Sequence, residues 1–128
     1  NLNTYQTFNK KIEKSKTDLF KYLSKYPNSL IIGKSFPARA SVILNYFSFL
    51  KDKMNFIAEQ PTSLKLNYYI AGTSIKIVDS KILKKLKPDI IIIFAWHLFK
   101  EIKNKWKAKG LLKSTKYVLM LPKLKIFK

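Results

Sequence analysis

The sequence predicts an α/β fold, specifically a Rossmann-like three-layer domain with a mainly parallel sheet and a leading N-terminal helix. Short apolar runs recur along the chain, and amphipathic stretches long enough to form crossover helices separate them. The run Ile90–Phe94 is apolar without alternation, which is typical of a strand buried on both faces. With 128 residues, 47% of them hydrophobic, we expect one domain covering residues 1–128.

The first predicted element is a helix over Thr4–Tyr26, because its apolar residues recur at helical spacing and form one stripe between lysine-rich faces. Pro27 ends this helix. A short strand is predicted at Ser29–Ile32, followed by a strand-to-helix turn at Gly33–Ser35. The apolar stripe of the first helix consists of Tyr5, Phe8, Ile12, Leu19, Tyr22, Leu23 and Tyr26.

The second predicted helix begins near Pro37, since proline suits the first helical turn. A strand follows at Asn55–Ala58, and residues 59–74 contain enough turn-forming residues to be mostly loop. Ile75–Val78 is predicted to be extended, with Asp79 capping a short helix that runs to Leu86. The predicted buried face of the second helix consists of Val42, Ile43, Tyr46, Phe47 and Leu50.

The C-terminal part continues the alternation of strands and helices. After the Ile90–Phe94 strand we expect a helix with Phe99, Ile102 and Trp106 on one side, ending at Gly110. A further strand is expected at Tyr117–Leu121 and a last one at Leu124–Phe127.

The net charge of +19 raises the alternative of a basic nucleic-acid-binding α/β module. Two observations speak against it. Arg39 is the only arginine, whereas proteins that read phosphates and base edges rely on bidentate guanidinium groups. The lysines are also spread over every predicted helix and loop instead of forming one stripe.

The composition bears on location as well. The longest apolar run is far shorter than the roughly 20 residues that a membrane span needs. The chain has no cysteine, and this agrees with a cytoplasmic origin. Because the chain begins at Asn1 without an initiator methionine, we expect it to be a domain of a longer protein.

Ligands of open parallel sheets gather at the carboxyl ends of the strands. Gly33, Lys34 and Ser35 follow the first predicted strand there, and Arg39 lies one turn into the next helix. A helix N-terminus offers unpaired N–H groups that favour phosphate, so this turn is a candidate anion site. An ordinary strand-to-helix turn, with the glycine in a left-handed conformation, is the alternative.

The ends of other predicted strands add further candidate binding or catalytic residues at the same edge of the sheet. Glu59 and Gln60 follow the second strand, and Trp96 and His97 follow the Ile90–Phe94 strand. His97 is the only histidine, and it shares a helix face with Glu101, so a structural pairing is the alternative to a catalytic role. Nucleophile motifs, metal-ligand clusters and paired carboxylates are absent from the sequence, and we predict no catalytic residues and no bound metal.

Three segments taken together carry a resemblance to a known family. Ile32–Phe47 is similar to the G-Y-G-A-P-A-K-x-N-T-L-L-N-Y stretch of the C-methyltransferase C-terminal domain, which includes deoxysugar nucleotide C-methyltransferases. Lys65–Thr73 resembles the K-x-G-x-Y-x-P-G-T loop of that family. Pro88–Ile102 resembles its P-D-x-(apolar)-A-W-N-x-x-x-E-I segment. Order and spacing hold over essentially the whole chain.

The resemblance implies the substrate-binding C-terminal domain of an S-adenosylmethionine-dependent C-methyltransferase acting on a nucleotide-linked sugar. The parent would then be a methyltransferase whose catalytic centre, S-adenosylmethionine and zinc lie outside this segment, with no cofactor bound here. The expected partners are the nucleotide-sugar substrate and the preceding S-adenosylmethionine-binding domain of the same chain. The implied substrate-binding residues are Gly33, Lys34, Ser35, Arg39, Tyr69, Gly72, Thr73, Trp96 and His97.

The sequence also departs from the family pattern. Ser35 stands in place of the second glycine, and Ala71 in place of the proline of P-G-T. Asn67 and His97 replace a glycine and an asparagine, and asparagine tolerates the left-handed region better than most residues. These substitutions keep a third reading open, a docking domain that has lost its ligand.

Overall fold

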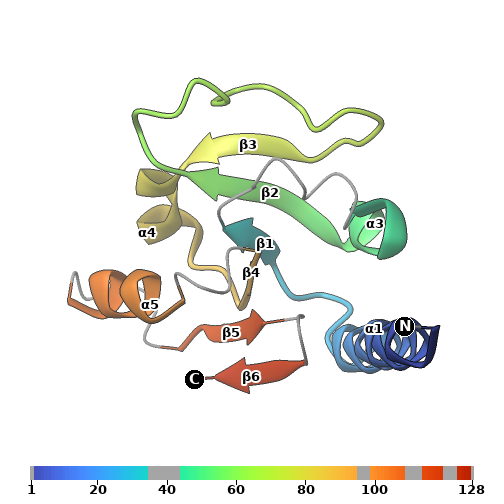
Figure 1. The fold of residues 1–128 in the computed structure, drawn as a ribbon. Coiled ribbons are helices and arrows are strands. Elements are labelled where there is room, and N and C mark those ends of the chain that lie inside the picture. Colours follow the sequence, from blue (N-terminus) through green and yellow to red (C-terminus); the bar gives the residue numbers. More distant parts are fainter. Residues whose placement is uncertain (1, 35–43, 95–98, 109–113, 120–123, 128) are drawn as a thin grey trace.

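The computed structural model describes residues 2–34, 44–94, 99–108, 114–119 and 124–127. Within these ranges six strands form one sheet (Figure 1). The strands are β1 Ile31–Lys34, β2 Met54–Glu59, β3 Lys76–Asp79, β4 Ile90–Ile93, β5 Lys116–Leu119 and β6 Lys125–Phe127. Their order across the sheet is β3-β2-β1-β4-β5-β6. Strands β1 to β5 pair in parallel, and β6 pairs antiparallel with β5. The predicted mainly parallel α/β sheet is confirmed.

The helices lie on both faces of this sheet, giving three layers. The described helical elements are α1 Leu2–Ser24, α3 Leu50–Lys53, the 3₁₀ turn η1 Ser80–Ile82, α4 Leu83–Leu86 and α5 Phe99–Ala108. Side chains of α1 and α3 pack on one face, and those of α4 and α5 pack on the other. The leading N-terminal helix and the layered architecture agree with the sequence-based prediction.

Alternation along the strands divides the core into two clusters. In β4, Ile90 and Ile92 face the α1 and α3 side, whereas Ile91 and Ile93 face the α4 and α5 side. All four are almost fully buried. A run of four isoleucines is therefore explained by a central strand with both faces covered.

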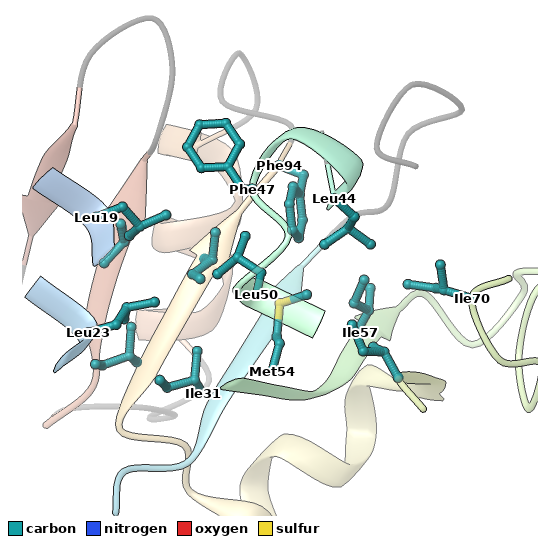
Figure 2. Close-up of a cluster of buried hydrophobic side chains, with 14 of the residues drawn as sticks. Leu19, Leu23, Ile31, Leu44, Phe47, Leu50, Met54, Ile57, Ile70 and Phe94 are labelled. Carbon is teal, nitrogen blue, oxygen red and sulfur yellow. The ribbon is translucent and has the colours of Figure 1, made fainter. Parts of the chain in front are cut away.

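The cluster on the α1 and α3 face is the larger of the two. Leu19 and Leu23 of α1, with Leu50 of α3, pack against side chains from β1, β2 and β4 (Figure 2). Phe94, directly after β4, lies in the same cluster. On the opposite face, Leu83, Phe99 and Ile102 cover residues of β1, β4 and β5.

Several predicted boundaries differ from the observed ones. Helix α1 begins and ends two residues earlier than predicted. Its end is earlier because the last turn before Pro27 is held by 3₁₀-type backbone bonds, in which the N–H groups of Lys25 and Tyr26 donate to the carbonyls of Tyr22 and Leu23. Gly33 and Lys34 belong to β1 instead of the following turn, because both pair in register with β4.

The predicted buried face of the second helix is only partly correct. Phe47 and Leu50 are buried, but Tyr46 is 39% exposed because its ring lies over the surface of α1 and its hydroxyl donates to Glu13. Leu50 begins the separate helix α3. Val42 and Ile43 lie outside the described residues.

Other local predictions are confirmed. The Asp79 side chain caps η1 by accepting a hydrogen bond from the Lys81 N–H at 2.9 Å. Asn67 adopts the left-handed region, with φ of 71°. In the part of the chain that the structure describes, no helix has the length and apolarity needed to cross a membrane.

Candidate functional site

The carboxyl ends of β1, β2, β3 and β4 form the edge on which the sequence placed a binding site. Lys34, the last residue of β1, pairs with Ala58 of β2 on one side and with Ile93 of β4 on the other. The next positions along this edge are Glu59 and Asp79, which pair with each other. The chain runs from β1 through β2 to β3 in one direction and then crosses back to β4 on the other side of β1, so Lys34 lies where the strand order reverses. In open α/β sheets, ligands bind in the crevice at this point.

Lys34 is unusual because it is a lysine buried at a strand end, with only 5% of its surface exposed. By alternation with Ile32, its side chain leaves the sheet on the α4 and α5 face. Burial lowers the pKa of the Lys34 ammonium below the usual lysine value, and Lys105 on α5 acts in the same direction. The carboxylates of Glu59 and Asp79 oppose this by raising the pKa. The result is an ammonium in a partly desolvated setting, close enough to the carboxylates of Glu59 and Asp79 to interact with them.

Gly33 precedes this lysine, and its role differs from the predicted turn. It does not adopt a positive φ. A Cβ added at Gly33 would come within 2.6 Å of the Phe94 ring, 3.1 Å of the Ile57 side chain and 3.1 Å of the Met54 sulfur. The left-handed turn considered for this glycine is therefore wrong, because the absence of a side chain serves core packing, where Phe94 crosses the strand.

The residues of the second predicted segment lie at the other end of the sheet. Tyr69 forms an antiparallel bridge with Lys76, and the Ile70 N–H donates to the Ile75 carbonyl at 2.9 Å. The turn that contains Gly72 and Thr73 therefore sits at the amino end of β3, whereas Lys34 lies at the carboxyl edge. Within this domain the structure does not bring the two groups together, and a substrate role for Tyr69, Gly72 and Thr73 stays a prediction.

The internal bonds of that turn are well defined. The Thr73 hydroxyl donates to the Ile70 carbonyl at 2.8 Å and accepts from the Ile75 N–H at 3.1 Å. Gly72 has φ of 74°, a conformation that glycine adopts without strain. Tyr69 is 61% exposed. The turn is thus held by its own hydrogen bonds, which explains a threonine directly after a glycine.

Four of the predicted site residues lie outside the described residues: Ser35, Arg39, Trp96 and His97. The strands that precede them do end side by side, because Lys34 and Ile93 are partners in the β1 and β4 pairing. The expectation that these two strand ends share one edge is confirmed.

Three charged residues near Lys34 were absent from the predicted binding set. The sequence predicts Glu59 at this edge from its position after a strand, but it does not assign Glu59 to the binding site. Asp79 is the helix cap that the sequence predicts. Its carboxylate also raises the pKa of Lys34, and this proximity follows only from the register of β2 and β3. Lys105 of α5 lies close enough to lower the pKa of Lys34. No local sequence signal indicates this proximity, because it depends on how α5 crosses the sheet.

The described residues do not form a metal centre. Within them, no group of three or more histidine, aspartate or glutamate side chains lies close enough to hold a metal ion, and the chain contains no cysteine. A zinc site does not fit these residues. Gly33 itself lies within β1, where Phe94 fills the space beside it, and the residues that follow β1 lie outside the described ranges.

The family model described as C-methyltransferase C-terminal domain matches residues 1–122. No curated protein matches the chain at a significant level.

Proposed function

The chain belongs to the C-methyltransferase C-terminal domain family, and from this premise we propose that it binds the substrate of an S-adenosylmethionine-dependent C-methyltransferase acting on a nucleotide-linked sugar. In this proposal the catalytic centre, the S-adenosylmethionine and the zinc belong to other parts of the parent protein. The domain contributes binding and orientation of the substrate.

The observation that carries the proposal is the buried ammonium of Lys34 at the point where the strand order reverses. In this proposal, the ammonium donates charge-assisted hydrogen bonds to a diphosphate that reaches this edge of the sheet. Charge-assisted hydrogen bonds of this kind contribute about 1.5–3 kcal/mol when both groups are desolvated. Ser35 follows Lys34 directly and Arg39 lies in the same segment of the sequence, and we propose that both contact the same diphosphate.

The carboxylate of Glu59 is a candidate acceptor for hydrogen bonds from the sugar of a nucleotide. In nucleotide-binding sheets of this strand order, an acidic residue after the second strand accepts hydrogen bonds from ribose hydroxyls. Glu59 is the last residue of β2 and adjoins Lys34 across the pairing with Ala58. We assign the phosphate to Lys34 and a pair of hydroxyls to Glu59.

Calorimetric titration of the full-length methyltransferase with a panel of nucleoside diphosphate sugars tests the proposal. We expect Lys34→Ala to weaken binding about tenfold or more. Lys53→Ala is the matched control, because Lys53 ends α3 at the opposite edge of the sheet. Equal affinities of wild type and Lys34→Ala would overturn the assignment. If the protein instead binds unrelated DNA duplexes with a steep dependence on salt, the nucleic-acid alternative takes its place.

A further inference from the structure

The N-terminal half of α1 carries an apolar face that nothing in the described domain covers. Leu2, Tyr5 and Phe8 are 70%, 63% and 57% exposed. Farther along the same helix, Leu19 and Leu23 are fully buried against the sheet. The helix thus changes from a surface element to a core element along its length.

The exposed and buried residues lie on the same side of the helix. Tyr5 and Leu23 are separated by about five full turns, and Phe8 lies within about 20° of Leu19 around the axis. The face that packs on the sheet therefore continues past the domain by about 15–20 Å. A solvated helix end has no need of aromatic residues in register with its buried face, so this register points to a second apolar surface.

The surroundings of these residues give the surface its shape and charge. Phe8 and Lys11 line a shallow hollow of about 350 Å³, together with Asn3, Thr4 and Thr7. On the other side, the Lys16 ammonium lies 5.1 Å from the centre of the Tyr46 ring, and the Tyr46 hydroxyl donates to Glu13. Glu13 and Lys16 are thus held against Tyr46, whereas Lys11 borders the apolar face directly. We call Leu2, Tyr5, Phe8 and Lys11 the α1 docking face.

We propose that the α1 docking face binds the methyltransferase domain of the same polypeptide, through an apolar patch with an acidic border. Two observations select this partner. The family is described as a C-terminal domain, so the rest of the methyltransferase chain is present at high effective concentration. A second copy of this domain is disfavoured, because it brings another net charge of +19 and another Lys11 against the first.

The inference rests on the family membership and on the geometry of α1, and it does not depend on the identity of the substrate. Hydrogen–deuterium exchange on the full-length protein tests domain docking separately from substrate binding. We expect the double variant Tyr5→Glu and Phe8→Glu to speed exchange of the α1 amides over residues 4–12 about tenfold. Small-angle scattering should show an increased radius of gyration. Both residues are exposed, so the domain itself stays folded, and circular dichroism checks this.

A matched double variant controls for the introduced charge. Leu64→Glu and Tyr68→Glu also replace two exposed apolar residues, which are 94% and 67% exposed in the 60–74 loop. We expect this control to leave α1 exchange unchanged. The proposal is overturned if both double variants give the same exchange and scattering as wild type. It is also overturned if sedimentation of the full-length protein shows a dimer that only the α1 variant dissociates.

The acidic border is tested separately. Lys11→Glu should speed α1 exchange at low salt, and the effect should shrink as the ionic strength rises. An unchanged rate at low salt would contradict an acidic partner surface. Calorimetry with nucleoside diphosphate sugars on the same proteins shows whether the substrate assignment fails independently of domain docking.

Discussion

The carboxylate of Asp89 accepts a hydrogen bond from the backbone N–H of Leu30, 59 residues earlier in the chain, at 2.8 Å. Backbone bonds reinforce the contact, because the N–H groups of Asp89 and Ile90 both donate to the Leu30 carbonyl. The Lys116 N–H also donates to the Asp89 carbonyl at 3.0 Å. Asp89 therefore joins the amino ends of β1, β4 and β5. These bonds align β4 and β5 with β1, which carries Lys34 at its opposite end.

Asp89→Ala should lower the free energy of unfolding by about 1 kcal/mol, since the Leu30 N–H loses a charged acceptor at a partly solvated position. Asp89→Asn is the control, because its amide oxygen can still accept the bond. Urea unfolding measures both variants. An alanine variant as stable as wild type would show that the backbone bonds alone hold the strand ends.

Gly33→Ala should destabilise the domain by about 1–3 kcal/mol, because the new methyl group meets the Phe94 ring inside the core. Phe94→Leu removes the ring that it meets. In the double variant we expect part of the destabilisation by Gly33→Ala to disappear, which thermal unfolding detects as a non-additive effect. Additive losses would mean that Phe94 does not set the requirement for glycine.

Lys34→Met should stabilise the ligand-free domain by about 1 kcal/mol at pH 7, because the lowered pKa of Lys34 means that the cost of burying its charge exceeds the attraction of Glu59 and Asp79. Burial lowers the pKa of Lys34 below 10.5 in the folded state. The unfolded chain therefore binds this proton more tightly between the lowered value and pH 10.5, and wild-type stability rises with pH across that window.

The advantage of Lys34→Met should consequently shrink as the pH approaches 10.5 and vanish above it. Urea unfolding of both proteins at several pH values measures the difference, in which the titration of all other lysines is shared. A methionine variant that is less stable at pH 7 would show that the interaction with Glu59 and Asp79 outweighs the cost of burial.

Thr73→Val should destabilise the domain by about 1 kcal/mol, because the Ile75 N–H loses its acceptor and the Ile70 carbonyl loses a donor. Thr62→Val is the control, since Thr62 is an exposed loop residue. Equal stability of the two variants would contradict a structural role for the Thr73 hydroxyl. Titration with nucleoside diphosphate sugars then tests the predicted substrate role, because affinity equal to wild type would assign the hydroxyl to the turn alone.

Local patterns in the chain were sufficient to predict the fold class and most elements. The isoleucine run of β4, the alternation of strands with helices and the Asp79 cap are properties of neighbouring residues, and each appears in the structure where it was expected. The position of Lys34 at the edge of the sheet was also predictable, because the carboxyl ends of parallel strands share an edge.

Long-range pairing decided the rest. The electrostatic influence of Glu59, Asp79 and Lys105 on Lys34 depends on the register of three strands and the crossing of α5, which no local pattern encodes. The separation of Thr73 from Lys34 has the same origin, since direction along a strand determines the edge that a turn reaches.

The burial of α1 likewise could not be predicted from local sequence. Sequence spacing places Tyr5 and Leu23 on one helical face, and this follows from helix geometry alone. Only the packed structure distinguishes the part of that face that meets the sheet from the part that extends beyond it. Periodicity reports which side of an element is apolar, whereas tertiary contacts decide what covers that side, because burial depends on residues distant in the sequence.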